Sequence, residues 1–349
     1  MENKVLIVDF GSQYTQLIAR RIRELFIFCE IYPYNNLPKK LLDYKAVVFS
    51  GSPYSVYQED SPNIDLEKFI GKIPVLAICY GAQFIANNQK GKVENSNSRE
   101  YGRARLTYID KDSILFNGIS KDNQVWMSHG DTIVELPEDA KLIASTESVE
   151  NAAYSLNEKK VFGLQFHPEV FHTDNGLKIF ENFFLHILKF NQDWTPKSFI
   201  QDSIKEIKTT VKNDKVILGI SGGVDSTVAA VLLNNAIGDN LNCVFVNNGL
   251  LRKDEFKEVL AQYENMGLNV VGVDASKEFI SGLRGITDPE QKRKVIGSIF
   301  IDVFENQSKK IQDAKWLAQG TIYPDVIESI SVKGPSSTIK SHHNVGGIP

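Results

Sequence analysis

The stretch Val216-Ile217-Leu218-Gly219-Ile220-Ser221-Gly222-Gly223-Val224-Asp225-Ser226-Thr227 decides how the second half of this chain folds. An apolar run ends in Ser-Gly-Gly and a helix-forming run begins just past Asp225, which predicts a strand, a tight turn and a helix N-terminus. Two glycines let the backbone bring N–H groups close to a ligand, and the helix start adds unpaired N–H donors. With the serine hydroxyls they form a cradle for pyrophosphate, where Asp225 is placed to hold Mg²⁺ against phosphate oxygens. The alternative is a Gly-Gly turn that only connects strand and helix.

The composition limits the classes of protein to which this chain can belong. Its 349 residues suffice for two domains of about 150 residues, and 42% are apolar, so each half can bury an ordinary core. The net charge of −4 gives no reason to expect nucleic acid or a membrane as a partner, and no apolar run approaches the ~20 residues that span a bilayer. The three cysteines, Cys29, Cys79 and Cys243, are too widely spaced for a disulfide framework or a metal site, so we expect a reducing, cytoplasmic location.

Strands alternate with helices in both halves of the sequence. In the first half, apolar runs at 5–8, 46–49 and 74–78 predict buried strands, and residues 93–165 predict short, antiparallel strands. In the second half, strands are expected at 241–246 and 269–273 besides the one that begins at Val216. The polar, proline-marked segment 191–196 separates the two patterns. We therefore expect an α/β protein with two doubly wound, mostly parallel sheet domains, residues 1–192 and 193–349.

Cys79 stands where a fully apolar strand meets a helix, and Gly81 allows the sharp turn that such a junction needs. This arrangement is typical of a nucleophile elbow, in which the helix N-terminus favours the thiolate. His167 and Glu169 follow a later strand, and residues i and i+2 of a strand point the same way. Glu169 can therefore hold the imidazole while His167 exchanges a proton with the sulfur.

Backbone N–H groups near the same cysteine predict an oxyanion hole. Tyr80 opens the helix and Gly51 follows a neighbouring strand, so an N–H from each segment can point at a developing oxyanion. Taken alone, a cysteine after an apolar strand is more often a buried core residue, and His-Pro-Glu is more often a loop. The combination of the three features favours nucleophilic catalysis.

The segments Cys79-Tyr-Gly-Ala-Gln83 and His167-Pro-Glu169 together resemble the class I glutamine amidotransferases. The resemblance implies that Cys79 forms a glutamyl thioester with glutamine and releases ammonia, and that Gln83 contacts the substrate. Ser128-His129-Gly130-Asp131 is similar to the loop that lines the glutamine site in one subgroup of the family. The family usually has Gly-Gly-Pro where this chain has Gly51-Ser52-Pro53.

The segment Ser221–Thr227 resembles the signature of the N-type ATP pyrophosphatases, and it lacks the Gly-Lys-Ser/Thr of a Walker motif. The resemblance implies that a carbonyl oxygen is adenylylated by ATP with Mg²⁺, and that a nitrogen or sulfur nucleophile then displaces AMP. The run Lys292-Arg293-Lys294, in the loop-like segment 282–294, can neutralise phosphates or form a solvated charged loop. The segment Tyr323-Pro-Asp325-Val-Ile-Glu328 can add two carboxylates near the same strand ends. Alternatively, Asp325 only begins a polar loop and Glu328 lies on a helix surface.

The order of the two units resembles the glutamine-hydrolysing GMP synthetase family over essentially all 349 residues. The resemblance implies that XMP, ATP and glutamine give GMP, AMP, pyrophosphate and glutamate, as ammonia from Cys79 chemistry attacks C2 of the adenylylated xanthine ring. It also implies that Arg293 contacts XMP and that the loop carrying Lys340 closes over the nucleotides. The expected partners are the small molecules glutamine, ATP and XMP, with a homodimer for the full-length protein.

Two features depart from that family. Asn247 stands where the family usually has Asp. The family also has a further C-terminal dimerisation domain that helps form the XMP site, and this chain ends at Pro349 without it. The chain therefore looks truncated, and we expect weak glutamine hydrolysis and little GMP.

Two other readings of the sequence stay open. The first is a different amidating or thiolating synthetase, such as an NAD synthetase or a tRNA-thiolating enzyme. An NAD synthetase would lack this class of amidotransferase. A tRNA-thiolating enzyme normally has a catalytic cysteine in its second half, whereas Cys243 lies in an apolar run typical of core packing. A glutamine- or nucleotide-sensing module without catalysis is the second.

Overall fold

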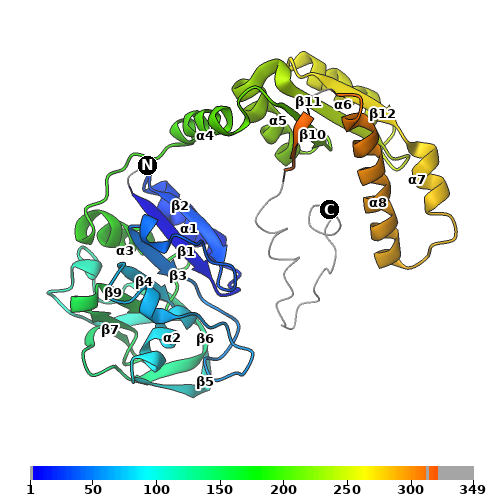
Figure 1. Ribbon diagram of the computed structural model, residues 1–349. Helices are drawn as coiled ribbons and strands as arrows, with labels where there is room; N and C mark the ends of the chain where they lie inside the picture. The colour runs from blue at the N-terminus through cyan, green and yellow to red at the C-terminus, as the bar shows by residue number, and fades with distance from the viewer. Residues whose placement is uncertain (1–2, 312–313, 321–349) are drawn as a thin grey trace. The chain divides into compact units, whose positions relative to one another are not determined.

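The computed structural model describes residues 3–311 and 314–320, and the chain divides between Thr195 and Pro196 into two compact units (Figure 1). Each unit has its own sheet and its own core, which confirms the predicted α/β class. The predicted boundary, after residue 192, lies in the same polar segment. Within the described ranges, no helix combines the length and apolar character that a membrane span needs.

A nine-stranded mixed sheet forms the centre of the first unit, in the order β2-β1-β3-β4-β9-β8-β7-β5-β6. The first five strands in that order pair in parallel, and the others pair antiparallel. The central parallel strands are fully apolar because both of their faces are covered. The strands are β1 (Lys4–Asp9), β2 (Phe28–Pro33), β3 (Ala46–Phe49), β4 (Val75–Ile78), β5 (Lys92–Ile109), β6 (Gln124–Glu135), β7 (Lys141–Thr146), β8 (Ala153–Leu156) and β9 (Val161–Leu164).

Alternate residues of the parallel strands pack against helices on opposite faces of the sheet. Val5 and Ile7 of β1 lie in one core with residues of α1 and α3, whereas Leu6 and Val8 lie in another with residues of α2. This two-sided packing is the doubly wound arrangement that the sequence predicts. The helices are α1 (Thr15–Glu24), α2 (Tyr80–Asn88) and α3 (Gly176–Glu181), which continues as a π-helical turn over Asn182–Ile187; 3₁₀ turns cover Leu41–Asp43, Leu66–Lys68, Ile114–Phe116 and Asn157–Lys159.

The antiparallel part of this sheet differs from the prediction of short strands. β5 has 18 residues and β6 has 12, and their ladder runs from the Lys92–Glu135 pair to the Arg105–Gln124 pair. Buried and more exposed residues alternate along β6, so one face of the strand packs on the core and the other does not. Ser128–Asp131 therefore lies inside a strand and not in a loop, because the alternation of buried residues continues through this segment.

Four parallel strands form the sheet of the second unit, in the order β12-β11-β10-β13. Val216 and Leu218 of β10 share a core with α5 and α6, and Ile217 shares another with α7 and α8, so this sheet is also covered on both faces (Figure 1). The strands are β10 (Lys215–Ile220), β11 (Leu241–Asn247), β12 (Val270–Asp274) and β13 (Ala314–Ala318); the helices are α4 (Pro196–Val211), α5 (Val224–Ile237), α6 (Glu255–Asn265), α7 (Ser276–Gly282) and α8 (Pro289–Ser308), with a 3₁₀ turn at Gly238–Asn240.

The segment that carries Lys292-Arg293-Lys294 is helical, which corrects the prediction of a loop there. Asp288 is the N-cap of α8, where its Oδ1 atom accepts a hydrogen bond from the N–H of Gln291 at 2.8 Å. Pro289 occupies the first turn, where its missing N–H costs nothing. Asp-Pro is thus a helix start in this chain, and the three basic residues follow in the first turns of the helix.

Candidate active sites

Cys79 occupies the turn between β4 and α2 in a strained conformation, with φ 50° and ψ −110°. Its N–H donates to the carbonyl oxygen of Leu164 at 2.7 Å, and the N–H of Gly81 donates to that of Ser50 at 3.2 Å. A β-carbon on Gly81 would lie 2.7 Å from Cβ of Phe49, so only glycine lets the start of α2 approach β3 this closely. The strain at a cysteine on a strand-to-helix turn is the geometry of a nucleophile elbow.

His167 and Glu169 follow β9 and form a buried pair, with 2.7 Å between Nδ1 and Oε1. Burial on its own opposes the charged imidazole, but the Glu169 carboxylate and the Cys79 sulfur raise the pKa of His167 well above 6.5. The other ring nitrogen, Nε2, makes no hydrogen bond of standard geometry to any described residue, which leaves it available to Cys79. The structure thus brings together the three residues predicted as a catalytic group.

Gly51 lies beside both reactive side chains. A β-carbon built on it would lie 3.3 Å from Cε1 of His167 and 3.6 Å from Cβ of Cys79. The N–H of Tyr80 is the first of α2 and directly follows the cysteine. The two backbone segments predicted to form an oxyanion hole therefore both adjoin Cys79.

Asp9 organises the loop behind Gly51, and its role was missed by the sequence analysis. Its buried Oδ1 atom accepts hydrogen bonds from the N–H of Gly11 at 2.9 Å and from the hydroxyl of Thr15 at 2.7 Å. The neighbouring Ser50 hydroxyl accepts the N–H of Phe10 at 2.9 Å and lies 2.9 Å from the carbonyl oxygen of Gly51. A carboxylate that ends the first strand, two residues before Gly11-Ser12, was the available signal.

β6 lines the other side of the cysteine. The sulfur of Cys79 lies 3.6 Å from the carbonyl oxygen of Ser128, and His129, the next residue along, is buried. Gly130 has open space around its α-carbon. The Gln83 side chain is buried and donates to the carbonyl oxygen of Asp131 at 2.6 Å, so it ties α2 to β6.

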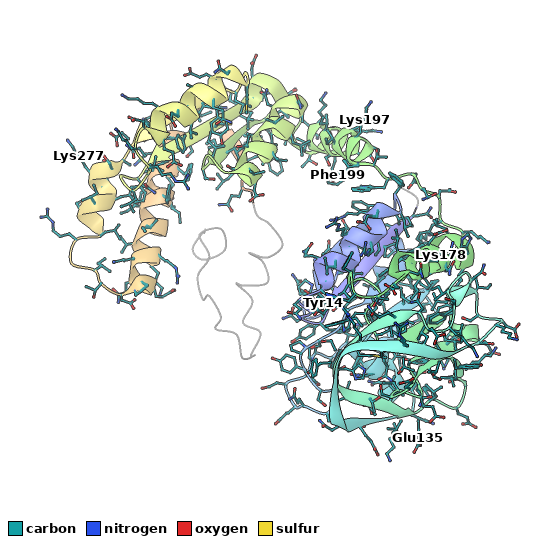
Figure 2. The ribbon with its side chains drawn as sticks, turned by 180° about the vertical axis from the view of Figure 1, so that it is seen from behind. Tyr14, Glu135, Lys178, Lys197, Phe199 and Lys277 are labelled. Atoms are coloured by element: carbon teal, nitrogen blue, oxygen red, sulfur yellow. The ribbon has the colours of Figure 1, made fainter. Side chains whose placement is uncertain are left out.

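Tyr14, the residue before α1, packs against the same imidazole. Its ring meets that of His167 edge to face, with 5.1 Å between the centroids and 73° between the planes. Figure 2 shows its side chain at the start of α1. The contact covers one side of the imidazole with an apolar surface.

The two buried histidines have pKa values shifted in opposite directions. Burial and the nearby charge of His167 lower the pKa of His129 to about 4. A folded-state pKa below the unfolded value means that stability increases as the pH rises from about 4 to about 6.5. The raised pKa of His167 acts the other way: its contribution is complete below about pH 6.5 and is lost as the pH rises through the folded-state value.

We expect the melting temperature of the first unit to be highest near pH 6.5 and to fall on the acid side because of His129. In His129→Gln, the free energy of unfolding should vary less between about pH 5 and about pH 6.5, by roughly 1–2 kcal/mol. Thermal unfolding of the two proteins across this range measures the difference. His186→Gln is the control for loss of an imidazole, because the His186 side chain is 44% exposed whereas His129 is buried. An unchanged acid limb in His129→Gln would show that another group causes it.

The second candidate site lies at the turn between β10 and α5. Gly222 has φ 80°, which favours glycine, and Gly223 is the N-cap of α5. The Ser226 hydroxyl accepts the N–H of Ser221 at 3.2 Å and donates to the carbonyl oxygen of Gly223 at 3.1 Å. The hydroxyl of Thr227, one residue on, donates to the same carbonyl oxygen at 2.8 Å. These bonds fix the backbone of the turn, and residues 221–225 are exposed to solvent.

The segment that follows β13 passes close to the same turn. A β-carbon on Gly320, after β13, would lie 3.4 Å from the nitrogen and the α-carbon of Ser226, so this part of the chain passes close to the start of α5. Asn247 ends β11, and its side chain accepts the N–H of Gly249 at 3.0 Å. Asparagine and aspartate side chains both accept such a backbone bond two residues on.

The other residues predicted for the second unit lie elsewhere in the chain. Arg293 lies in α8, where its guanidinium is 3.3 Å from Glu290. Lys340 and the segment 323–328 lie outside the described residues. Cys243 is fully buried in β11, which confirms its predicted packing role.

Comparison with known proteins finds a family model that matches part of each unit. Residues 6–187 match the family described as "Glutamine amidotransferase class-I", and residues 197–295 match the one described as "NAD synthase". Proteins named "GMP synthase [glutamine-hydrolyzing]" from Flavobacterium psychrophilum and Christiangramia forsetii are each 59% identical over 349 residues, which is 100% of this chain and 69% of the relative. The crystal structure of a "putative gmp synthase" component from Thermoplasma acidophilum is 30% identical, covers 54% of this chain and 99% of its own, and has a TM-score of 0.47.

Proposed function

Because this chain belongs to the glutamine-hydrolysing GMP synthases, we propose that its first unit releases ammonia from glutamine and its second unit uses that ammonia to convert XMP to GMP. The full reaction consumes XMP, ATP, glutamine and water, and gives GMP, AMP, pyrophosphate and glutamate. The observation that carries the proposal is the arrangement around Cys79, which adjoins the buried His167–Glu169 pair, the Gly51 segment and the start of α2. The match of relatives over the whole chain argues against a separate NAD synthetase or a tRNA-thiolating enzyme.

In the first unit, the Cys79 sulfur attacks the side-chain carbonyl carbon of glutamine. The oxyanion that forms lies between the N–H of Tyr80 and an N–H of the Gly51 segment, where each donor is worth about 3 kcal/mol. His167, whose pKa is raised by Glu169 and Cys79, gives its proton to the leaving nitrogen, so ammonia departs and a glutamyl thioester remains. The imidazole then takes a proton from water, which hydrolyses the thioester to glutamate and restores the thiolate.

In the second unit, the turn at Ser221–Thr227 is proposed to bind the phosphates of ATP. Residues 221–225 are exposed and open a helix, and the first N–H groups of a helix have no intrahelical partner, which suits a phosphate chain. The O2 oxygen of XMP attacks the α-phosphorus and releases pyrophosphate, and ammonia then displaces AMP at C2. Arg293, which is 52% exposed in its side chain, is proposed to contact XMP, and Lys340 to close over the nucleotides.

The Asp225 carboxylate suits a magnesium ion that accompanies ATP. It is exposed at the start of α5 and makes no ion pair or hydrogen bond to another described residue. Within the described residues no group of three His, Cys, Asp or Glu side chains forms a protein-only metal site. One carboxylate together with substrate phosphates is the set that Mg²⁺ usually takes, and the ion would neutralise phosphate charge.

Asp225→Asn should weaken magnesium-dependent ATP binding by about 10-fold or more, because the amide loses the charge that attracts the ion. Isothermal titration of the protein with ATP, with and without Mg²⁺, measures the change. Asp239→Asn is the matched control, since Asp239 is an exposed carboxylate just past the other end of α5. Unchanged magnesium-dependent affinity in Asp225→Asn would overturn this assignment.

Labelling by a glutamine-directed electrophile tests the first unit separately. 6-Diazo-5-oxonorleucine should attach to Cys79 in one-to-one stoichiometry, as peptide mass spectrometry would show, and glutamine should slow the reaction. The absence of labelling would favour the sensor interpretation. The three cysteines are free and buried, and we propose that the protein works in a reducing cytoplasm, where Cys79 stays a thiol.

A further inference from the structure

The three consecutive carbonyl groups of His167, Pro168 and Glu169 each lie against one particular residue elsewhere in the first unit, two of them in hydrogen bonds. The hydroxyl of Thr173 donates to the carbonyl oxygen of His167 at 2.6 Å. Nε of Arg21 donates to that of Glu169 at 3.1 Å. Gly176 lies directly against that of Pro168, so close that a β-carbon at this position would overlap the oxygen. None of these three contacts involves a side chain of the catalytic pair, so they act on the backbone that carries it.

Thr173 connects this backbone to β6. Its hydroxyl accepts the N–H of Trp126 at 3.0 Å while it donates to the carbonyl oxygen of His167, and the N–H of His167 donates to the carbonyl oxygen of Trp126 at 2.9 Å. The Thr173 hydroxyl therefore bridges the Trp126 N–H and the His167 carbonyl oxygen, which form no direct hydrogen bond with each other. Thr173 is 5% exposed, so water does not readily replace this bond.

Gly176 fixes the middle of the same segment by its lack of a side chain. It is the first residue of α3, and its N–H lies 3.3 Å from the carbonyl oxygen of Thr173. A methyl group here would push the peptide between Pro168 and Glu169 away from α3. Because Glu169 is 1% exposed and pairs with His167, such a shift moves the carboxylate that orients the imidazole.

Arg21 holds the last carbonyl group from α1. Its Nη1 atom pairs with Glu24 at 2.9 Å, which fixes the guanidinium on the helix surface while Nε reaches Glu169. Arg20, its neighbour, also pairs with Glu24, at 3.0 Å, but is 74% exposed in its side chain. The two arginines thus differ in the contact to the catalytic segment.

We propose that Arg21, Thr173 and Gly176 are positioning residues that set the angle of the His167 imidazole toward Cys79. The inference rests on the proposed hydrolysis of glutamine. Proton transfer requires the ring nitrogen and the reacting atoms at hydrogen-bonding distance, and a displacement of about 1 Å can cost about 100-fold in rate. Substrate binding does not depend on that angle, so the loss should appear in kcat and not in KM.

Thr173→Val and Thr173→Ser form the decisive pair. Valine keeps the shape and loses the hydroxyl, and it should lower kcat for glutamine hydrolysis by about 10- to 100-fold, with KM changed by less than about 3-fold. Serine keeps the hydroxyl and should restore kcat to within about 3-fold of the wild type. The alkaline limb of the rate against pH should move to lower pH in Thr173→Val, because a displaced imidazole is held less closely by Glu169 and Cys79.

Gly176→Ala and Arg21→Gln test the other two contacts, with Arg20→Gln as the matched control. Both test variants should lower kcat by at least about 10-fold, and the control should keep it within about 2-fold of the wild type. Melting temperatures show which variants fold. If Gly176→Ala does not fold, Thr173→Val and Thr173→Ser still test the positioning inference. A wild-type protein that does not hydrolyse glutamine would refute the proposed function. A wild-type protein that does, with Thr173→Val equal to it or with serine as poor as valine, would refute the positioning inference alone.

Discussion

Cys79→Ala is expected to abolish glutamine hydrolysis and with it the formation of GMP from glutamine. Removal of the nucleophile from a catalytic group typically costs on the order of 10⁴- to 10⁶-fold in kcat, because no other side chain forms the covalent intermediate. The strained turn at φ 50° accepts alanine as well as cysteine, so the fold should persist. Glutamate release measured by an enzyme-coupled assay quantifies the loss. The second unit should still bind ATP, because the substitution lies in the other compact unit.

Cys29→Ala is the control for this prediction. Cys29 lies buried in β2, where burial raises the pKa of its thiol to about 11, and its sulfur lies 3.6 Å from the carbonyl oxygen of Ala19. Such a thiol stays protonated and unreactive at neutral pH. Its replacement should leave kcat within about 3-fold of the wild type, at some cost in packing. Hydrolysis by Cys79→Ala at more than about a tenth of the wild-type rate would contradict the proposed nucleophile.

Gly163→Ala should destabilise the first unit by about 3 kcal/mol, the upper part of the range for overpacked cores. Gly163 pairs directly with Tyr154 across β9 and β8, and a β-carbon on it would overlap the tyrosine ring and lie 2.8 Å from its hydroxyl oxygen. The ring has no room to move, since it is fully buried and its hydroxyl donates to the carbonyl oxygen of Ala82 at 2.8 Å. The strain therefore falls on the strand pairing itself.

Thermal unfolding should show a melting temperature lower by about 6–12 °C for Gly163→Ala, from the usual relation for a unit of this size. Because Ala82 belongs to α2, the helix that begins after Cys79, glutamine hydrolysis should lose heat stability in parallel. Gly130→Ala provides the comparison, since Gly130 also lies in a strand of this sheet but has no atom within 4 Å of an added β-carbon. Equal melting temperatures for the two variants would show that the tyrosine ring relaxes without cost.

Both candidate sites were predictable because their key residues stand next to each other in the sequence. Cys79 directly follows an apolar run, and Ser221–Thr227 joins a second one to a helix, so a strand end and a helix start are recognisable locally. The pairing of His167 with Glu169 was predictable because the two are separated by one residue after a strand. Such features depend on local geometry, which a few neighbouring residues determine.

Two local predictions were wrong for identifiable reasons. The basic run at 292–294 was assigned to a loop because glycine and proline precede it, whereas Asp288 and Pro289 cap a helix of 20 residues. Ser128–Asp131 was expected in a loop because it is similar to a loop of the amidotransferase family, whereas pairing with β5 keeps the segment extended. In the second case the partner strand determined the backbone.

The sequence by itself determined the two α/β units, the strand-to-helix turns at Cys79 and Ser221, and the catalytic role expected for Cys79. Only the tertiary structure decided what surrounds them. Arg21 contacts Glu169 from 148 positions away, and Asp9 supports the Gly51 loop through Ser50, 41 positions away. Contacts of this kind exist only after helices and strands have packed. Their geometry depends on the whole core, and no pattern of neighbouring residues records it.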